Sequence, residues 1–579
     1  MKTYSVLLNR LFFFFIGLSF FCNDAHSSEW VDSVLVTLSL EEKAGQLVLA
    51  ELRPSKDQTV PVDTAWIDAE SLVKEHQVGG FVLFGGSFPG VIEKLESLQA
   101  SSSVPLLFAA DFEKGAGQKI TGTTKFPPVM ALGAAGSEDL AYRVGLLTAL
   151  QAVELGIGMT FSPVLDVNSN PLNPIINVRS FSEDPRAVFT LGQSYIRGCR
   201  EGGLLTTAKH FPGHGDTEVD SHTNLPVINK GRPEFEQLEL LPFRRVLESG
   251  VDAVMVGHLS VPALDSTGTP ASLSGRIVNG ILREEMGFQG LVVTDALVMD
   301  GVNIDQDRTS IYRKALSAGI DILLMPESVE DCVNAILDAV GTGEIEESTL
   351  NRHVRRVLEA KEKTVQARNL MRPESVEKRM TGLLLEGENT ALELANKSIT
   401  LLSNTGRPLP LDERSGNVFA VIMRGDSLLP EAAFFNRMMK KNLGERYDYV
   451  SLLSVPDSVT LEQVNRKAER ADRVFVITVS QVRAFRGYPG LPPDMISLAR
   501  DLLRNDLSVV VSLGNPYIIA DFPDTPGIIL AYGTERHSQK ALAGAILGKT
   551  RVSGKLPVTI PGGFAIGSGI MLGGHKHGR

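Results

Sequence analysis

Short apolar runs alternate with longer amphipathic stretches between residues 40 and 326, and this alternation constrains the fold more than any other feature. Runs that are apolar throughout are typical of strands buried on both faces, and their alternation with helical stretches favours parallel βαβ units. The helical stretches include 140–155, 185–202, 233–249 and 277–286. Eight apolar runs predict a TIM-like (β/α)8 barrel, and they cover 44–52, 78–85, 104–111, 158–167, 204–213, 252–262, 290–297 and 321–326.

A second, smaller α/β unit follows the barrel. A charged helical stretch covers 336–363, and the polar segment 366–388, which contains Pro373, is typical of a connector. The later apolar runs cover 398–403, 418–423, 474–479, 509–513 and 527–531, and helical stretches separate them at 430–441, 461–471 and 494–504. We therefore predict a barrel domain over 28–365, a linker over 366–392 and an αβα sandwich over 393–579. Two domains suit a chain of 579 residues, which is longer than one core usually serves.

The N-terminus carries Lys2 and Arg10, followed by an apolar run over 11–21 that is too short to span a bilayer comfortably. This pattern predicts a signal peptide over 1–27 and therefore an exported protein, periplasmic or extracellular. Cys22 directly after the run leaves a lipoprotein as the alternative. The other two cysteines, Cys199 and Cys332, lie in helical stretches, and we expect buried free thiols there.

The formal net charge of −11 argues against a nucleic-acid binder and against a polybasic membrane binder. We expect no nucleic-acid partner, no stable membrane partner except a lipid anchor at Cys22, and a monomer. The charge carries no positive information about a substrate.

The stretch 209–222, KHFPGHGDTEVDSH, has an unusual density of ionisable residues. Lys209 and His210 follow an apolar run and are expected at a strand end, while residues 220–222 belong to a loop able to reach back over them. One interpretation is catalytic, with His222 moving protons and Asp220 orienting it. A polar structural loop is a second interpretation. A metal site is a third, because six side chains are possible ligands: His210, His214, Asp216, Glu218, Asp220 and His222. An ammonium beside a cation is unfavourable, so Lys209 counts against a metal.

Other polar residues lie where the predicted strands end. They are Asp111, Asp166, His258 and Asp295. In a (β/α)8 barrel the chemistry lies at the C-terminal ends of the strands, and a core sheet has no structural need for so many ionisable groups there. The pattern predicts a functional rim.

The stretch 209–222 resembles the signature of family 3 glycoside hydrolases, in the branch that removes β-linked N-acetylglucosamine. The resemblance implies that Asp220 and His222 form an acid/base dyad. It also implies that Asp295, within the segment Thr294–Met299, is the nucleophile. Phrases at 397–402, 512–517 and 554–558 are similar to the family's second domain. The same resemblance assigns sugar binding to Asp111, Arg179, Lys209 and His210, and places His258 near the pocket.

General chemistry supports these roles. A retaining glycosidase needs a nucleophile and a proton donor, and Asp295 at a strand end is well placed to attack, although such an Asp can also cap the next helix. A histidine exchanges protons near neutrality, and the adjacent carboxylate of Asp220 would fix its tautomer. A neutral imidazole also repels an anionic incoming group less than a carboxylate does. For His258, a satisfied core histidine is an equal alternative.

One segment departs from the family pattern. The family usually has a Glu-Gly-Gly-Arg-like turn after the aspartate, whereas this chain has Glu-Lys-Gly-Ala-Gly over 113–117. The arginine expected to hold sugar hydroxyls is missing, and Lys114 or Lys119 is the candidate to replace it. The selectivity for the sugar is therefore open.

The leading expectation is an exo-acting retaining β-N-acetylglucosaminidase without cofactor or metal. Its substrates would be cell-wall muropeptide fragments or chitin-type oligosaccharides. A β-glucosidase or β-xylosidase of the same superfamily is the alternative enzyme, and the Asp-Ser-His ending argues against it. A non-catalytic carbohydrate-binding relative would have lost the nucleophile or the dyad, and this sequence retains both.

Overall fold

The computed structural model of the protein describes residues 28–53, 63–302, 307–369, 375–483, 485–487 and 489–573. The predicted signal peptide, including Cys22, lies outside the described residues. No helix within these ranges is long and apolar enough to cross a bilayer.

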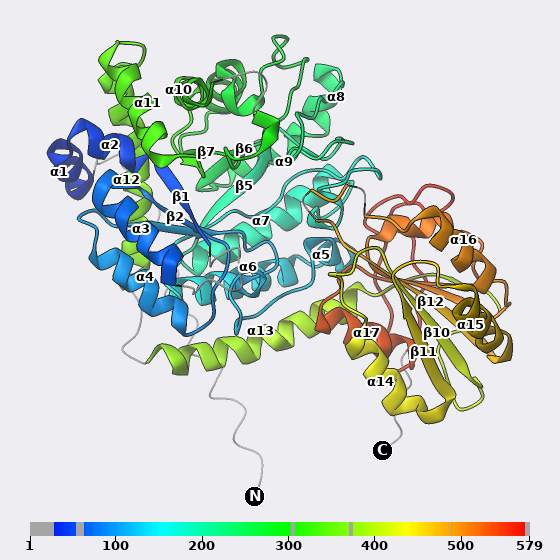
Figure 1. Ribbon diagram of the computed structural model, residues 1–579. Helices are drawn as coiled ribbons and strands as arrows, with labels where there is room; N and C mark the ends of the chain where they lie inside the picture. Colours follow the sequence, from blue (N-terminus) through cyan, green and yellow to red (C-terminus); the bar gives the residue numbers. More distant parts are fainter. Residues whose placement is uncertain are drawn as a thin grey trace, which may run out of the picture.

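The first domain is a parallel barrel, as predicted (Figure 1). Neighbouring strands pair in the order β7-β6-β5-β4-β3-β2-β1-β8, and a bridge between Val293 and Ile322 brings β7 against β8, so the barrel is nearly closed. Each of the eight predicted apolar runs contains one strand. The strands are β1 (Val48–Leu52), β2 (Gly80–Leu83), β3 (Leu107–Ala110), β4 (Met159–Thr160), β5 (Leu205–Phe211), β6 (Ala253–Val256), β7 (Leu291–Thr294) and β8 (Leu323–Leu324).

Helices surround this barrel. Local signals fix their starts: Asp184 caps the amide of Arg186 with Pro185 in the first turn, and Ser39 forms a capping box with Glu42. The helices are α1 (Glu29–Thr37), α2 (Leu40–Gln46), α3 (Asp63–His76), α4 (Gly90–Ala100), α5 (Val129–Ala135), α6 (Glu138–Glu154), α7 (Pro185–Glu201), α8 (Arg232–Gln237), α9 (Leu240–Glu248), the wide-turn helix η4 (Arg276–Glu285), α10 (Arg308–Ala318), α11 (Val329–Gly341) and α12 (Glu347–Asn369).

Three boundaries differ from the sequence prediction, and one of them is the charged helical stretch 336–363, which belongs to two helices, α11 and α12. Residues 44–46, predicted as strand, belong to α2, because its capping box starts a helix that runs into the apolar segment. The stretch 233–249 was predicted as one helix and forms two, α8 and α9, which meet at Leu238 and Glu239.

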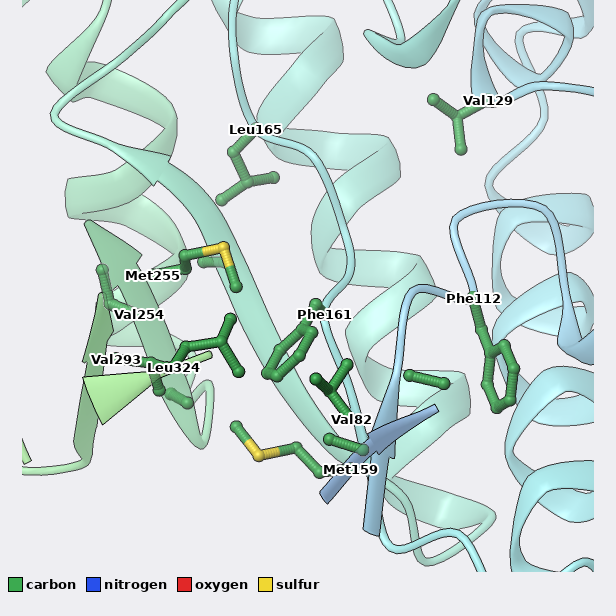
Figure 2. Packing of buried hydrophobic residues seen from close by; sticks show 14 of the residues in the cluster. Val82, Phe112, Val129, Met159, Phe161, Leu165, Val254, Met255, Val293 and Leu324 are labelled. Atoms are coloured by element: carbon green, nitrogen blue, oxygen red, sulfur yellow. The ribbon is translucent and has the colours of Figure 1, made fainter. Parts of the chain in front are cut away.

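The barrel interior is filled by side chains from several strands. Figure 2 shows Val82, Phe161 and Leu324 converging inside the ring of strands. These side chains are almost fully buried, and Met159 and Met255 lie in the same cluster. Cys199 and Cys332 are buried free thiols, as expected. The barrel is therefore a packed support for residues at its rim.

The second domain is a six-stranded sheet in the order β11-β10-β12-β13-β14-β9, parallel except for β9, which runs antiparallel to β14. Five of the strands match predicted runs. The strand β11 was not predicted, because it lies at the edge of the sheet and only two of its six residues are fully buried. The elements are β9 (Thr400–Asn404), β10 (Val418–Arg424), α14 (Ala433–Leu443), β11 (Tyr447–Leu452), α15 (Ser458–Arg470), β12 (Arg473–Ser480), α16 (Pro493–Leu502), β13 (Val509–Gly514), β14 (Gly527–Ala531) and α17 (Arg536–Ile546).

The predicted linker is largely helical, which corrects the interpretation of 366–388 as a polar connector. Helix α13 (Val376–Ser398) begins at the cap Ser375 and packs against α5 and α6 of the barrel domain and α17 of the second domain (Figure 1). Many of its buried residues are small, such as Gly387, Thr390 and Ala391. A close helix contact needs small residues, and these weakened the apolar periodicity on which the prediction rested.

The two domains also meet directly beside the barrel rim. Asn168 donates to the Tyr517 hydroxyl at 2.7 Å, and Asn177 donates to the side-chain oxygen of Asn515 at 3.0 Å. Apolar residues of both domains belong to one continuous core cluster. The second domain therefore stands as a wall beside the C-terminal ends of the barrel strands.

Candidate active site

A cavity of about 480 Å³ opens at the C-terminal ends of the barrel strands. Its floor is apolar and includes Val82, Phe161 and Leu324, the side chains that Figure 2 shows within the barrel. One side is formed by Gln481, Val482 and Phe485, which follow β12 of the second domain. Six of the predicted site residues line it: Asp111, Arg179, Lys209, His210, His222 and Asp295.

Lys209, on β5, is at the centre of a buried ion-pair network. Its Nζ lies 2.8 Å from Oδ1 of Asp111 and 2.8 Å from Oε1 of Glu113. Only 3% of the Lys209 side chain is exposed. Burial alone would lower the pKa of Lys209, but the two carboxylates raise it, so the ammonium is fixed as a charged donor.

Glu113 also holds Arg179 through a bidentate pair. Nε and Nη2 of Arg179 lie 3.0 and 2.9 Å from the two oxygens of Glu113. Although burial would raise the pKa of Glu113, Arg179 and Lys209 hold it well below its usual range. Glu113 was not predicted as a site residue, and nothing in its local turn signals that it neutralises two cations far along the chain.

A second pair orients His210. Its Nδ1 lies 2.7 Å from Oδ2 of Asp166, and its Nε2 lies 3.3 Å from Nη2 of Arg179. Because a guanidinium only donates, Nε2 is the acceptor and the proton is placed on Nδ1. Asp166 also accepts the backbone amide of His214 at 2.7 Å. Asp166 was noticed at a strand end, and the structure places it behind His210 as its support.

Asp295 follows β7, and its side chain borders the cavity. Its Oδ1 accepts the amide of Ala296 at 2.8 Å. Burial would raise the pKa of Asp295, but His210, His258, His222 and this amide outweigh burial and lower the pKa to about 2. The carboxylate is thus ionised near neutral pH, the form that a nucleophile requires.

His222 and Asp220 form a close pair on the loop after β5. Nδ1 of His222 lies 2.7 Å from Oδ1 of Asp220, which also accepts the amide of His222 at 3.0 Å. Asp220 is buried behind the ring, whereas 26% of the His222 side chain is exposed. The carboxylate fixes the proton on Nδ1, and Nε2 makes no hydrogen bond to any other described residue.

His214 braces this loop from within. Its Nδ1 lies 2.8 Å from Oγ1 of Thr217, and its Nε2 lies 2.9 Å from Oγ of Ser221. Burial and the nearby His210 lower the pKa of His214 to about 4, so the ring is neutral at physiological pH. A neutral ring that links Thr217 to Ser221 holds the loop on which Asp220 and His222 lie.

Two predicted site residues do not line the cavity: Asp220, which lies behind His222, and His258. His258 is fully buried, its Nδ1 lies 2.7 Å from Oγ of Ser272, and its Nε2 donates to the carbonyl oxygen of Ala296 at 3.1 Å. Burial lowers its pKa. Both ring nitrogens are engaged, which is the arrangement of a satisfied core histidine supporting the segment around Asp295.

The described ranges contain no group of three or more His, Cys, Asp or Glu side chains placed to hold a metal ion, so no geometry supports the metal interpretation of 209–222. Lys230 lies 3.1 Å from Asp216 and 3.1 Å from Glu239, so Asp216 is engaged in a salt bridge. Ionisable residues of this stretch are instead engaged in ion pairs and hydrogen bonds with one another and with residues elsewhere in the barrel domain.

The departure after Asp111 places lysines beside the cavity. Lys119 lies 3.7 Å from Oδ2 of Asp111, and its Nζ stands 4.4 Å from the centre of the Phe84 ring. Lys114 also lines the cavity, and burial together with Lys125 lowers its pKa to about 8. The cationic side of the cavity is therefore retained without the expected arginine.

The chain was compared with known families and structures. Residues 39–360, more than half of the chain, match the family model "Glycosyl hydrolase family 3 N terminal domain". Among curated proteins, β-hexosaminidase A of Pseudoalteromonas piscicida is 28% identical, with 93% of this chain and 99% of that protein covered. A β-hexosaminidase of Thiobacillus denitrificans is 35% identical over 43% of this chain and 71% of its own length.

Solved structures of glycoside-processing enzymes are also similar to this chain. A family 3 β-N-acetylglucosaminidase from Paenibacillus sp. str. FPU-7 superimposes with a TM-score of 0.79 at 31% identity, covering 90% of this chain and 99% of that chain. A β-glucoside phosphorylase, BglX, bound to 2FGlc superimposes with a TM-score of 0.81 at 26% identity, covering 92% and 96%. The matched family model, these relatives and the rim geometry lead to one conclusion: the chain belongs to glycoside hydrolase family 3.

Proposed function

We propose that this glycoside hydrolase is an exo-acting, retaining β-N-acetylglucosaminidase. Its substrates would be cell-wall muropeptide fragments or chitin-type oligosaccharides. The observation that carries the proposal is the His222–Asp220 pair, 2.7 Å apart, beside a cavity that also holds the ionised carboxylate of Asp295. These groups are the nucleophile and the proton carrier that a two-step displacement needs.

In the first step, a carboxylate oxygen of Asp295 attacks the anomeric carbon and forms a glycosyl ester. The bond from that carbon to the leaving oxygen breaks, and the leaving oxygen takes a proton from Nε2 of His222. The imidazole must therefore begin this step protonated on both nitrogens, with Asp220 stabilising its charge. The ring ends the step neutral, with its remaining proton on Nδ1.

In the second step, neutral His222 accepts a proton from a water molecule through Nε2. The water oxygen bonds to the anomeric carbon, and the ester bond to Asp295 breaks and returns the carboxylate. His222 is again an imidazolium and Asp295 an anion, so the cycle closes. The product keeps the β configuration because two inversions occur at one carbon.

The network around Lys209 supplies the contacts for the terminal sugar. Asp111, Lys209, Arg179 and His210 present charged and neutral hydrogen-bonding groups at one side of the cavity. Hydroxyl groups and an acetamide each donate and accept, so a wall of fixed donors and acceptors suits them. The names of the relatives, β-hexosaminidase and β-N-acetylglucosaminidase, support an N-acetylated sugar.

The experiment is a panel of nitrophenyl β-glycosides carrying N-acetylglucosamine, N-acetylgalactosamine, glucose or xylose. We expect the N-acetylglucosaminide to have the highest kcat/KM. Higher kcat/KM with glucose or xylose would overturn the sugar assignment and favour the alternative enzymes. Turnover of none of the four, by a correctly folded protein, would favour the carbohydrate-binding alternative.

Phosphorolysis is a second candidate, in which inorganic phosphate replaces water in the second step. The similarity to the solved β-glucoside phosphorylase favours it, as does a neutral imidazole that does not repel an incoming anion. Adding phosphate to the assay separates the two candidates. Phosphorolysis predicts a sugar 1-phosphate and a faster second step, whereas hydrolysis predicts free sugar at an unchanged rate.

Export is also part of the proposal. The apolar run over 11–21 supports it, and the N-terminal sequence of the protein recovered from its native host tests it.

A further inference from the structure

The segment after β12 reaches out of the second domain and contacts the proton-transfer loop of the barrel. The amide of Phe485 donates to Oδ2 of Asp220 at 2.9 Å. The ring of Phe485 meets the ring of His222 edge to face, with centroids 5.1 Å apart and planes at 66°. One residue of the second domain therefore touches both members of the dyad.

Phe485 is unusual in two respects. Its φ is +65°, a left-handed conformation that costs energy for a bulky side chain, and 65% of it is exposed although it is a large apolar residue. Burial of its own ring in the core does not explain this placement. Strained, exposed residues of this kind are found where a protein needs a side chain at a defined point.

The segment is anchored on both sides of Phe485. Before it, Arg483 lies 3.1 Å from Oδ2 of Asp426, which follows β10. After it, Asn515, which follows β13, donates to the carbonyl oxygen of Pro489 at 2.8 Å. The ends of two strands of the second domain therefore hold the segment on either side of Phe485.

Phe485 contacts parts of the dyad that the other described supports do not reach, namely Oδ2 of Asp220 and the ring of His222. Both hydrogen bonds from His222 fall on Oδ1 of Asp220, and among the described residues the amide of Phe485 is the donor to Oδ2. On the barrel side, the ring nitrogens of His214 bond to Thr217 and to Ser221, which lies between the two dyad residues, and not to the His222 ring. The His222 ring thus has a carboxylate at Nδ1 and the aromatic ring of Phe485 as a neighbour.

We infer that Phe485 is a positioning residue for the acid/base: the second domain uses its amide and its ring to hold Asp220 and His222 in the geometry for proton transfer. This inference rests on the proposed roles of His222 and Asp295. It assigns the second domain a part in both chemical steps. A ring that only lined the leaving-group side of the cavity would matter in the first step alone, because the leaving group has departed before the second.

The test therefore measures the second step by itself. An N-acetylglucosaminide with a fast-leaving dinitrophenol loads the enzyme, and intact mass in a quenched-flow series follows decay of the glycosyl ester on Asp295. Phe485→Gly removes the ring and retains the amide in a backbone conformation that glycine adopts freely. We expect ester decay to slow at least about tenfold, since small displacements of a catalytic group have effects up to about a hundredfold.

Three further variants make the result specific. Phe485→Tyr keeps the ring and should restore most of the decay rate. Asp426→Ala loosens the anchor at Arg483 and should slow decay less than Phe485→Gly. Tyr449→Ala removes an exposed aromatic residue from the edge strand β11 of the same domain. In this control, the ester should decay at the wild-type rate.

Ester decay at the wild-type rate in Phe485→Gly, with only the rate or KM of ester formation changed, would overturn the inference and leave the ring as a wall for the leaving group. His222→Ala separates this failure from that of the proposed function. If ester decay is slow in His222→Ala and normal in Phe485→Gly, only the inference fails. If decay is normal in both, the acid/base assignment fails first.

Discussion

The proposed sugar-binding side and the proposed proton-transfer side of the cavity are built differently. The sugar-binding side rests on strand ends and buried ion pairs, and the side chain of Lys209 is 3% exposed there. The proton-transfer side rests on a loop, and His222 is 26% exposed and fixed by hydrogen bonds to Asp220. Fixed charges suit a sugar that must stay in place, whereas an acid that alternates between two protonation states needs access to the reacting atoms on both occasions.

The difference also concerns where the support comes from. Asp111, Glu113, Arg179 and Lys209 neutralise one another within the barrel domain. Asp220 takes one of its hydrogen bonds from the second domain. Changes in the first group should therefore alter binding and stability, and changes in the second should alter individual chemical steps. The predictions below test this contrast.

The largest effect is expected from Asp295→Ala. The variant removes the proposed nucleophile, so turnover should fall by more than about 10⁴-fold, as for residues that form a covalent intermediate in other enzymes. Steady-state kinetics with a nitrophenyl N-acetylglucosaminide measures the loss, and circular dichroism checks the fold. A rate close to that of the wild type in the folded variant would remove Asp295 from this role.

His222→Ala should slow substrates unequally. A nitrophenol leaves without protonation, whereas a sugar leaving group needs a proton, so chitobiose hydrolysis should fall by about 10²–10⁴-fold and nitrophenyl release by less. The ester on Asp295 should accumulate and be visible by intact mass.

Asp220→Ala is the companion of that variant and should give a milder form of the same pattern, since it removes the orienting group and leaves the proton carrier. Equal slowing of both substrate types by His222→Ala, without ester, would mean that His222 only shapes the loop.

Glu113→Gln tests the sugar-binding side. The change removes the bidentate carboxylate partner of Arg179 and leaves Lys209 with Asp111, and loss of one partner of a buried ion pair costs about 3 kcal/mol of unfolding free energy. Urea denaturation measures this cost. The control Glu248→Gln breaks an exposed pair with Arg245 and should change stability by less than about 0.5 kcal/mol. An equal, small effect of both would show that the buried network does not stabilise the barrel rim.

Glu239→Gln tests how the residues that support the proton-transfer loop affect the pH dependence of stability. Burial raises the pKa of Glu239 from its ordinary value near 4.5 to about 7, despite Lys230. The native state therefore binds this proton more tightly than the unfolded chain, so the stability it contributes is complete below pH 4.5 and is lost as pH rises through 7. At about 1.4 kcal/mol per unit of pKa shift, the wild type should lose about 2–3 kcal/mol over this range.

The Gln variant should lack this part of the pH dependence. The check is the unfolding free energy of both proteins at pH 5, 6, 7 and 8. Parallel curves would show that Glu239 does not titrate in this range.

Removal of divalent metal ions should leave the enzyme's activity unchanged, which is the smallest effect expected here. The ammonium of Lys209 disfavours a cation beside it, and the acids of the loop have cationic or hydrogen-bonding partners. Activity after dialysis against a chelator should equal activity before it. Stoichiometric zinc in the purified protein, with activity lost on its removal, would contradict the contrast drawn above.

The sequence was informative wherever a pattern was local. Apolar runs predicted the barrel strands and five strands of the second sheet, because burial on both faces leaves a continuous apolar signature. The sequence did not predict α13, because small residues at its helix contacts hide the apolar periodicity. It did not predict β11, because exposed residues at the sheet edge interrupt the apolar run. Glu113 and Phe485 were missed because their significance depends on partners 66 and 265 residues away.

The contact between Asp220 and Phe485 also has a consequence for biosynthesis. A ribosome makes the chain from its N-terminus, so Lys209 and Asp295 emerge well before the segment after β12. The amide of Phe485, which bonds to the carboxylate of Asp220, is synthesised 265 residues after Asp220. A nascent barrel would thus gain its sugar-binding charges early and its complete acid/base late, and a chain broken off between the domains would bind sugar without the support for cleaving it.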